Sequence, residues 1–268
     1  MTLTCEVVLH LGAHRTGTTL FQHFLSSNLD FLNNVGIDIL VPPATRAGLL
    51  QDIQPQDGRL LISEENLMGN MQDNVAMARL YPLATQRLRA LDNLLGHCQR
   101  VMLSVRNPAD WWPSAIAFSL TRGMALPEAD QIQAIARSDR HWTDVVSDVR
   151  AILPNAEIVV REFNWAVDRP RQQLRQATRW EEVAGALART RVHNPRPDRS
   201  EMDRILTERG QKPLAGLGDS YEPFDPKTRR RLTRAYLDDL AKIRGMAGVR
   251  LLSDPLGDLR QRLLAPPD

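Results

Sequence analysis

Lysine, cysteine and long apolar runs are scarce in this chain, and each shortage excludes a class of protein. Arginine supplies all but three of the 34 basic residues, and the 32 acidic residues leave a net charge of only +2. This balance argues against a general nucleic-acid or membrane-surface binder. No run approaches the ~18 apolar residues of a spanning helix, and residues 1–11 lack the basic flank and apolar segment of a signal peptide. We therefore expect a soluble cytoplasmic protein with no transmembrane segment and no nucleic-acid partner.

Only two cysteines are present, Cys5 and Cys98, and each precedes or begins an apolar, strand-like run. One possible pair in 268 residues is no disulfide framework, and neither spacing fits a zinc site. The histidines at positions 10, 23, 97 and 141 share no metal-ligand spacing. We expect two buried thiols in a reducing compartment and no bound metal.

Apolar runs and helix-period patterns alternate along the chain. Strands are predicted at 5–11, 36–41, 59–63, 100–105 and 156–161. Helices are predicted at 18–29, 75–95, 110–136, 142–153, 170–188 and 225–246, with a loop at 193–199. Two prolines interrupt these helices, since Pro82 predicts a kink or restart and Pro127 a break. The alternation predicts an α/β fold in which a central parallel sheet lies between two helical layers.

The length and a hydrophobic content of 43% suffice for one sizeable domain. We expect a single domain over 1–268. Residues 1–165 would form its core and carry the chemical motifs, and 166–268 would add a mainly helical C-terminal part.

The segment Gly12-Ala13-His14-Arg15-Thr16-Gly17-Thr18-Thr19 joins the first predicted strand to the first predicted helix. Its frame, Gly-x-x-x-x-Gly-Thr-Thr, is typical of a phosphate-binding loop, in which glycines let backbone N–H groups and a helix N-terminus approach an anion. A nucleotide triphosphatase has Lys directly after the second glycine. Here Thr18 occupies that position, and the cation lies inside the loop as Arg15. The segment predicts a P-loop NTPase-like fold. Its planar guanidinium would contact a different atom of the bound anion from the one that the lysine of a triphosphatase contacts.

A second segment, Arg106-Asn107-Pro108, ends the fourth predicted strand, and Ser114 follows about two helical turns later. Ligands of parallel α/β sheets bind beyond the carboxyl ends of the strands. Arg106 is therefore expected at the same edge as the first loop. An arginine with a hydroxyl is a suitable pair for a second phosphate.

Two phosphate sites at one edge suggest a nucleotide with phosphates at both ends of its ribose, and here the chain resembles the PAPS-dependent sulfotransferases. That family's phosphosulfate motif, Lys/Arg-[Ser/Thr]-Gly-Thr-Thr, is matched by Arg15-Thr16-Gly17-Thr18-Thr19. Its 3′-phosphate motif, Arg-[Asp/Asn]-Pro with Ser eight residues after the Arg, is matched by Arg106-Asn107-Pro108 and Ser114. The segment 62–66, Ile-Ser-Glu-Glu-Asn, also resembles bacterial members. The resemblance covers about the first 120 residues.

The resemblance implies that the donor is 3′-phosphoadenosine 5′-phosphosulfate (PAPS), that the product is adenosine 3′,5′-bisphosphate (PAP), and that no metal is needed. Arg15, Thr18 and the loop N–H groups would stabilise charge on the oxygen that leaves with the 5′-phosphate. An acceptor hydroxyl needs a general base, and the candidates are Glu64, Glu65 and His14. Strand alternation puts the two glutamates on opposite sides, so at most one of them serves. A solvated acidic pair is the alternative interpretation.

Two other functions share these motifs. A small-molecule kinase using ATP and magnesium would use the same loop, although the lysine is missing and the Arg106 and Ser114 pair is unexplained. A non-catalytic relative would bind nucleotide without turnover. The expected acceptor is a hydroxyl or amine of a small molecule or carbohydrate, enclosed by residues 44–57, 69–74 and 121–140. Neither its identity nor the oligomeric state follows from the sequence.

Overall fold

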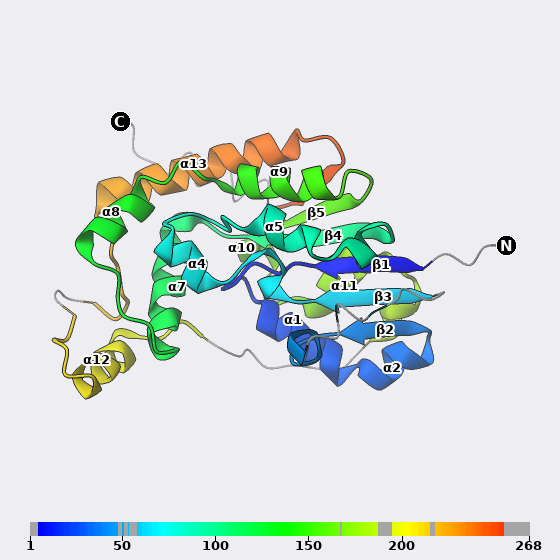
Figure 1. Ribbon diagram of the computed structural model, residues 1–268, viewed down its shortest axis with the longest axis horizontal. Helices are drawn as coiled ribbons and strands as arrows, with labels where there is room; N and C mark the ends of the chain where they lie inside the picture. The colour runs from blue at the N-terminus through cyan, green and yellow to red at the C-terminus, as the bar shows by residue number, and fades with distance from the viewer. Residues whose placement is uncertain are drawn as a thin grey trace.

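The computed structural model describes residues 5–47, 50, 53, 58–166, 168–186, 195–214 and 218–254. At its centre is a sheet of six strands in the order β2-β3-β1-β4-β5-β6, and every pairing is parallel (Figure 1). The strands are β1 (Glu6–His10), β2 (Ile37–Leu40), β3 (Arg59–Ser63), β4 (Cys98–Val105), β5 (Glu157–Glu162) and β6 (Val249–Leu252). Because all six run the same way, their carboxyl ends meet at one edge.

Helices fill the connections between these strands. They are α1 (Thr18–Ser27), α2 (Leu29–Asn34), α4 (Met71–Ala76), α5 (Ala84–Arg89), α6 (Asp92–Leu95), α7 (Pro108–Thr121), α8 (Ala129–Ala136), α9 (Trp142–Ile152), α10 (Phe163–Ala166), α11 (Pro170–Thr178), α12 (Arg199–Glu208) and α13 (Pro226–Arg244). Short 3₁₀ turns lie at η1 (Ala44–Ala47), η2 (Glu65–Met68) and η3 (Glu182–Gly185).

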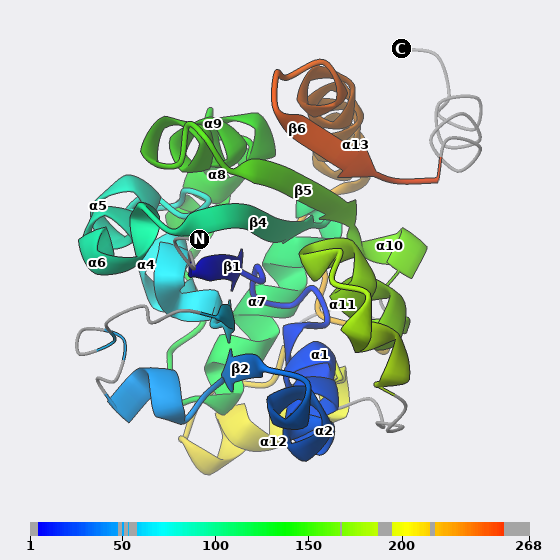
Figure 2. The same cartoon turned by 90° about the vertical axis from the view of Figure 1, so that its right-hand side faces the viewer.

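Both faces of the sheet are buried, which explains why its central strands are continuous apolar runs. Alternate β1 residues take opposite sides, with Val7 and Leu9 in one apolar cluster and Val8 in the other. The first cluster includes side chains of α4, α5, α6, α7, α9 and α13, and the second those of α1, α2 and α11 (Figure 2). The three-layer arrangement around a parallel sheet is thus as predicted.

The helix predicted over 75–95 is wrong as one element. It is divided into α4, α5 and α6, so the restart expected at Pro82 occurs, but within a longer irregular stretch. Ala78 and Tyr81 have positive φ angles of 52° and 45°, and the side chain of Asn74 accepts the Tyr81 N–H at 2.9 Å. This side-chain bond holds Tyr81, five residues beyond the end of α4, in a non-helical turn.

The sixth strand, β6, was not predicted. Its four residues follow Gly248 at the edge of the sheet, and all are only partly buried, so the apolar signal is short and weak. The helix predicted over 170–188 is α11 followed by η3, and its last two residues lie outside the described part of the chain. In the predicted loop 193–199, residues 193 and 194 also lie outside it, and α12 begins at Arg199.

Within the described ranges, no helix combines the length and apolar character needed to cross a membrane.

Candidate functional site

The loop between β1 and α1 leaves the centre of the sheet at its carboxyl edge. Three of its residues have positive φ angles: Gly12 at 37°, Arg15 at 60° and Gly17 at 80°. A positive φ is strained for arginine, and such strain is typical of functional loops. A Cβ atom at Gly12 would lie 2.7 Å from the Thr18 side chain and 2.8 Å from His10 Cε1, so only glycine fits there.

Threonine hydroxyls close this loop on itself. The hydroxyls of Thr16 and Thr18 both donate to the main-chain oxygen of Ala13, at 2.5 and 3.1 Å. The loop N–H groups are therefore displayed on a compact frame at the start of α1. Thr18 and Thr19 line the cavity in front of that helix, where a helix N-terminus favours an anion.

Three buried aromatic side chains hold the two motif segments by their main chains. Trp111 donates from Nε1 to the oxygen of His14 at 2.7 Å, and Trp142 donates from Nε1 to the oxygen of Arg106 at 2.8 Å. The Tyr81 hydroxyl accepts the His14 N–H at 2.7 Å. The three rings lie against one another, with centroids 6.0 to 6.3 Å apart. They form a rigid support under the site.

The two arginines singled out in the sequence are in contact. Arg106 donates from Nη1 to the main-chain oxygen of Arg15 at 2.9 Å, and Arg15 donates from Nε to Ser114 Oγ at 3.0 Å. Each guanidinium also lies over an aromatic ring at 4.6 Å, Arg15 over Phe118 and Arg106 over Phe163. Segments about 90 residues apart in the chain thus form one cationic centre.

Burial and mutual repulsion make this centre a good anion site. Burial, then repulsion from Arg106 and Arg196, lower the pKa of Arg15 to about 10. The pKa of Arg106 is also lowered, chiefly by burial and further by Arg196, although Asp110 opposes the change. Both groups remain charged at neutral pH. An anion placed among them would relieve the repulsion.

The two candidate glutamates have different environments. The carboxylate of Glu64, 3% exposed, accepts from the Thr45 hydroxyl, the Arg46 guanidinium and the Asn66 N–H. Burial alone would raise the pKa of Glu64, but these hydrogen bonds outweigh it and hold the pKa below its usual value. Glu65, 16% exposed, accepts from Gln22 at 2.7 Å and from Arg46 at 2.8 Å. Glu65 lines the cavity, whereas Glu64 lies behind it.

His14 is held in one orientation. The Tyr81 hydroxyl lies 3.0 Å from Nδ1, and Asn66 Oδ1 lies 3.2 Å from Nε2. Since the amide oxygen is an acceptor, the proton is assigned to Nε2, and the hydroxyl donates to Nδ1. Burial lowers the pKa of His14 despite the nearby carboxylates of Glu65 and Glu64, so the ring is neutral.

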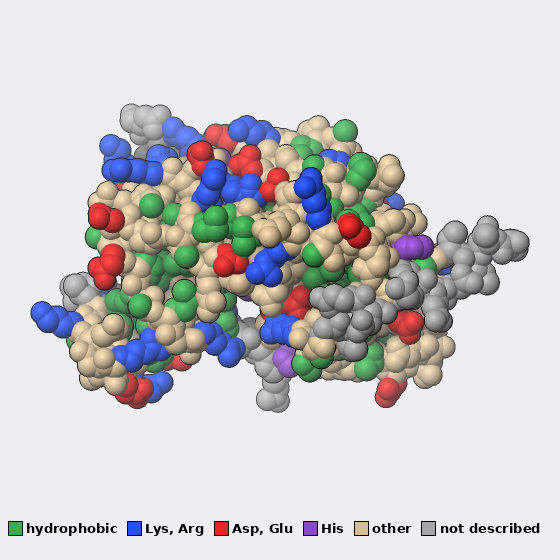
Figure 3. Space-filling view, viewed as in Figure 1, with side chains coloured by type: hydrophobic (Ala, Val, Ile, Leu, Met, Phe, Trp, Pro, Cys, Tyr) green, Lys and Arg blue, Asp and Glu red, His purple; other side chains and the backbone are tan. Residues whose placement is uncertain are grey.

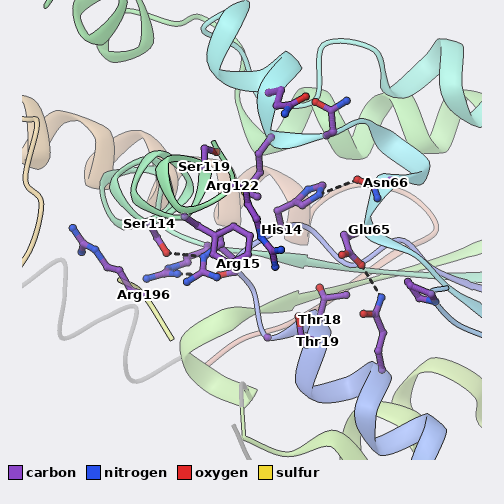
Figure 4. A pocket seen from close by; sticks show the side chains of 18 of the residues that line it. His14, Arg15, Thr18, Thr19, Glu65, Asn66, Ser114, Ser119, Arg122 and Arg196 are labelled. Atoms are coloured by element: carbon purple, nitrogen blue, oxygen red, sulfur yellow. Dashed lines mark hydrogen bonds between the residues drawn. The ribbon is translucent and has the colours of Figure 1, made fainter. Parts of the chain in front are cut away.

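A cavity of about 990 Å³ extends from these groups, at the upper end of the range for ligand pockets. Figure 3 shows a hollow on this face of the molecule, with basic side chains at its rim. Glu65 is the one acidic residue among the described lining residues, and six are arginines: Arg15, Arg46, Arg87, Arg106, Arg122 and Arg196. In Figure 4, Arg196, Ser114 and Arg15 lie on one side, Glu65 and Asn66 on the other, and His14 and Arg122 between them.

Most of the residues singled out in the sequence meet in this cavity. His14, Arg15, Gly17, Thr18, Thr19, Glu65, Arg106 and Ser114 line it, whereas Gly12, Ala13 and Thr16 lie in the supporting loop, outside the lining. The three stretches expected to enclose an acceptor each contribute, through Arg46, Asn70 and Arg122 among others. Residues 48–49, 51–52 and 54–57 of the first stretch lie outside the described residues.

Other important residues were missed. Tyr81, Phe118, Arg122 and Arg196 had no assigned role, and only the basic character of the 193–199 loop hinted at Arg196. In the part of the chain that the structure describes, no group of three or more His, Cys, Asp or Glu side chains is arranged to hold a metal ion.

No protein-family model matches this chain, and no curated protein matches it.

Proposed function

We propose that this protein is a sulfotransferase that moves a sulfuryl group from PAPS to a hydroxyl or amine of an acceptor. The observation that carries the proposal is the contact between the two motif arginines, with Arg106 Nη1 at 2.9 Å from the Arg15 oxygen and Ser114 Oγ at 3.0 Å from Arg15 Nε. A nucleotide with phosphates at both ends of its ribose requires two such neighbouring anion sites.

The residues present fit such a donor. Arg15, Thr18, Thr19 and the loop N–H groups would bind the 5′-phosphosulfate. Arg106 and Ser114 would bind the 3′-phosphate, which would take the place of the Arg15 side chain on the serine hydroxyl. Arg196 supports this end, because it lines the same cavity, and its Nη2 is held by the Tyr221 oxygen and by Glu222.

The proposed reaction is an in-line displacement at sulfur. A bond forms between the acceptor oxygen and sulfur, and the bond between sulfur and the 5′-phosphate oxygen breaks. That oxygen leaves with its electron pair on PAP, and the acceptor proton goes to a base. Arg15 and the loop N–H groups would stabilise the charge that grows on the leaving oxygen, so catalysis would consist mainly of positioning and electrostatics.

Among the candidate bases, the geometry favours Glu65. Its carboxylate lines the cavity and is held there by Gln22 and Arg46. The carboxylate of Glu64 already accepts hydrogen bonds from Thr45, Arg46 and the Asn66 N–H, and Glu64 does not line the cavity. Both ring nitrogens of His14 are engaged, so His14 fits a role in orienting a ligand. We therefore assign the proton transfer to Glu65.

A calorimetric titration with PAP, compared with ATP and magnesium, tests the proposal against the kinase alternative. Metal-independent binding of PAP that Arg106→Ala weakens about 30- to 100-fold is expected, because the change removes charged hydrogen bonds to phosphate. Preference for ATP with magnesium would overturn the proposal in favour of a kinase. PAP binding without sulfuryl transfer to any acceptor in a broad screen would favour a non-catalytic binder.

A further inference from the structure

The second half of α7 carries a hydroxyl with no partner. Ser119 is 4% exposed and lines the cavity, yet its Oγ makes no hydrogen bond to any described residue. Buried hydroxyls are nearly always hydrogen-bonded, because an unmade bond costs free energy. The Ser119 hydroxyl therefore has an unused hydrogen bond at the wall of the cavity, and rotation about its Cα–Cβ bond would turn it toward a ligand.

An arginine lies three residues further along the same helical face. Arg122 caps α7, lines the cavity and places its guanidinium 5.0 Å from the centre of the Phe118 ring. Arg15 lies over the same ring at 4.6 Å. Phe118 therefore contacts two guanidinium groups. One belongs to Arg15 of the proposed donor site, and the other belongs to Arg122, which is part of neither donor motif. Arg122 makes no ion pair with an acidic residue in the described ranges.

The carbonyl end of α7 does not repel an anion at this position. Arg209, at the end of α12, donates to the main-chain oxygens of Leu120 and Met124, each at 2.8 Å. This cation covers the partial negative charge that the last carbonyls of a helix carry.

The connection between β3 and β4 supplies a second cation. Arg87 of α5 lines the same cavity, and its Nε is buried with no hydrogen-bond partner among the residues that the structure describes. Its Nη2 lies 3.4 Å from an Asp73 carboxylate oxygen, at the long end for an ion pair. Two buried polar atoms without partners, Ser119 Oγ and Arg87 Nε, therefore belong to residues that line one cavity.

We propose that Ser119, Arg122 and Arg87 form a binding site for an anionic group on the acceptor, such as a carboxylate, sulfate or phosphate. The proposal rests on the sulfotransferase function, since it assigns to the acceptor the anion site that the donor leaves unused. These residues would bind the anionic group of the acceptor, and the hydroxyl or amine of the acceptor would then lie between Arg15 and Glu65. The protein would thus transfer sulfuryl groups to acidic molecules.

Anion binding to the PAPS-loaded protein tests this site without knowledge of the acceptor. With PAPS in place, its phosphates and sulfuryl group occupy the donor site, and inorganic sulfate and acetate are titrated separately at constant ionic strength. Binding of either anion is expected to weaken about 10- to 100-fold in Arg122→Gln and about 3- to 10-fold in Ser119→Ala. Tighter binding of acetate would indicate a carboxylate, and tighter binding of sulfate a sulfate or phosphate group.

Arg89→Gln is the matched control, because Arg89 is exposed on the same helix as Arg87 and does not line the cavity. It should bind both anions as the unaltered chain does. Ser119→Ala removes no hydrogen bond, so it should keep the thermal stability and the PAPS affinity. Failure of PAPS to bind would refute the donor assignment. Binding of PAPS with no detectable anion binding, or anion binding that Arg122→Gln leaves unchanged, would overturn the acceptor site alone.

Discussion

The indole of Trp111 donates to the main-chain oxygen of His14 at 2.7 Å, so a residue of α7 fixes the backbone of the loop that follows β1. Trp111 comes five residues after Arg106, and His14 comes directly before Arg15. This buried hydrogen bond therefore helps to fix the distance between the two motif arginines, together with the direct contact from Arg106 to the Arg15 oxygen. This coupling makes the anion site sensitive to changes beneath it.

We predict that Trp111→Phe lowers the free energy of unfolding by about 1–3 kcal/mol, because the His14 oxygen loses its buried donor. The affinity for PAP should fall as well, since the loop backbone is no longer fixed. Denaturant unfolding and calorimetric titration measure the two effects. The control is Trp180→Phe, because Trp180 is buried and its Nε1 makes no hydrogen bond within the described part of the chain. Equal PAP affinity in both variants would contradict the coupling.

Glu64 and Glu65 should respond differently to removal of charge. Glu64→Gln is expected to lower the free energy of unfolding by about 1–3 kcal/mol, because its carboxylate accepts several buried hydrogen bonds. Glu65→Gln should cost less than about 1 kcal/mol, as its Arg46 partner is half exposed. Its turnover number should instead fall about 10²- to 10⁴-fold with PAP affinity kept. Normal turnover in Glu65→Gln would refute its role as the base.

Gly12→Ala should disrupt the loop between β1 and α1. The added Cβ would lie 2.7 Å from the Thr18 side chain at a positive φ, so we expect a loss of about 1–3 kcal/mol and loss of PAP binding. Gly36→Ala separates the two causes, because Gly36 also has a positive φ but nothing within 4 Å of an added Cβ. It should be destabilised by about 1 kcal/mol and bind PAP normally.

Stability should fall as the pH is lowered from 6 to 5. His10 is fully buried between Ser63 and Gln173, and burial, followed by repulsion from Arg161, lowers its pKa to about 3. The unfolded chain takes up the proton near pH 6.5 but the folded protein does not. The free energy of unfolding therefore decreases by about 1.4 kcal/mol per pH unit for this one group.

His14, whose pKa is also lowered by burial, adds to the same slope. Glu64 acts at lower pH, because the hydrogen bonds from Arg46, Thr45 and Asn66 hold its pKa in the folded state below the usual value of a glutamate. Its contribution to stability is therefore lost only in more acidic solution. Urea unfolding at several pH values measures how the free energy of unfolding changes with pH. In His10→Gln this slope should correspond to about one proton fewer taken up on unfolding.

The features that were predictable from the sequence are those encoded locally. The loop 12–19 follows an apolar run and precedes a helix-period pattern, and Arg106 ends another apolar run, so parallel-sheet geometry brings both to one edge. The three-layer fold follows from the same alternation. Local patterns also placed Ser114 on the next helix, seven residues into α7.

The features that were missed depend on contacts between distant segments. Tyr81 reaches His14 only because the chain breaks after α4 and takes a positive φ at a bulky residue, which no local rule predicts. Ser119 and Arg122 lie on a helix that is apolar over much of its surface, so their position in the cavity is set by packing. Glu64 and Glu65 lie beyond the end of β3, at the start of the turn η2, so the predicted strand alternation does not apply to them. Both accept from Arg46, and only their other hydrogen bonds and the position of Glu65 on the cavity wall distinguish them.

The β3–β4 connection, residues 64–97, has a consequence for how this protein can diversify. It supplies Glu65, Asn66, Asn70 and Arg87 to the cavity, whereas Arg15, Ser114 and Arg106 come from the connections after β1 and β4. If the proposed function is correct, sequence changes confined to this one crossover would alter the recognition of the acceptor and leave the proposed donor site in place. Such an exchange has to keep two groups of the crossover, the carboxylate of Glu65, which we propose as the base, and the Tyr81 hydroxyl that holds His14.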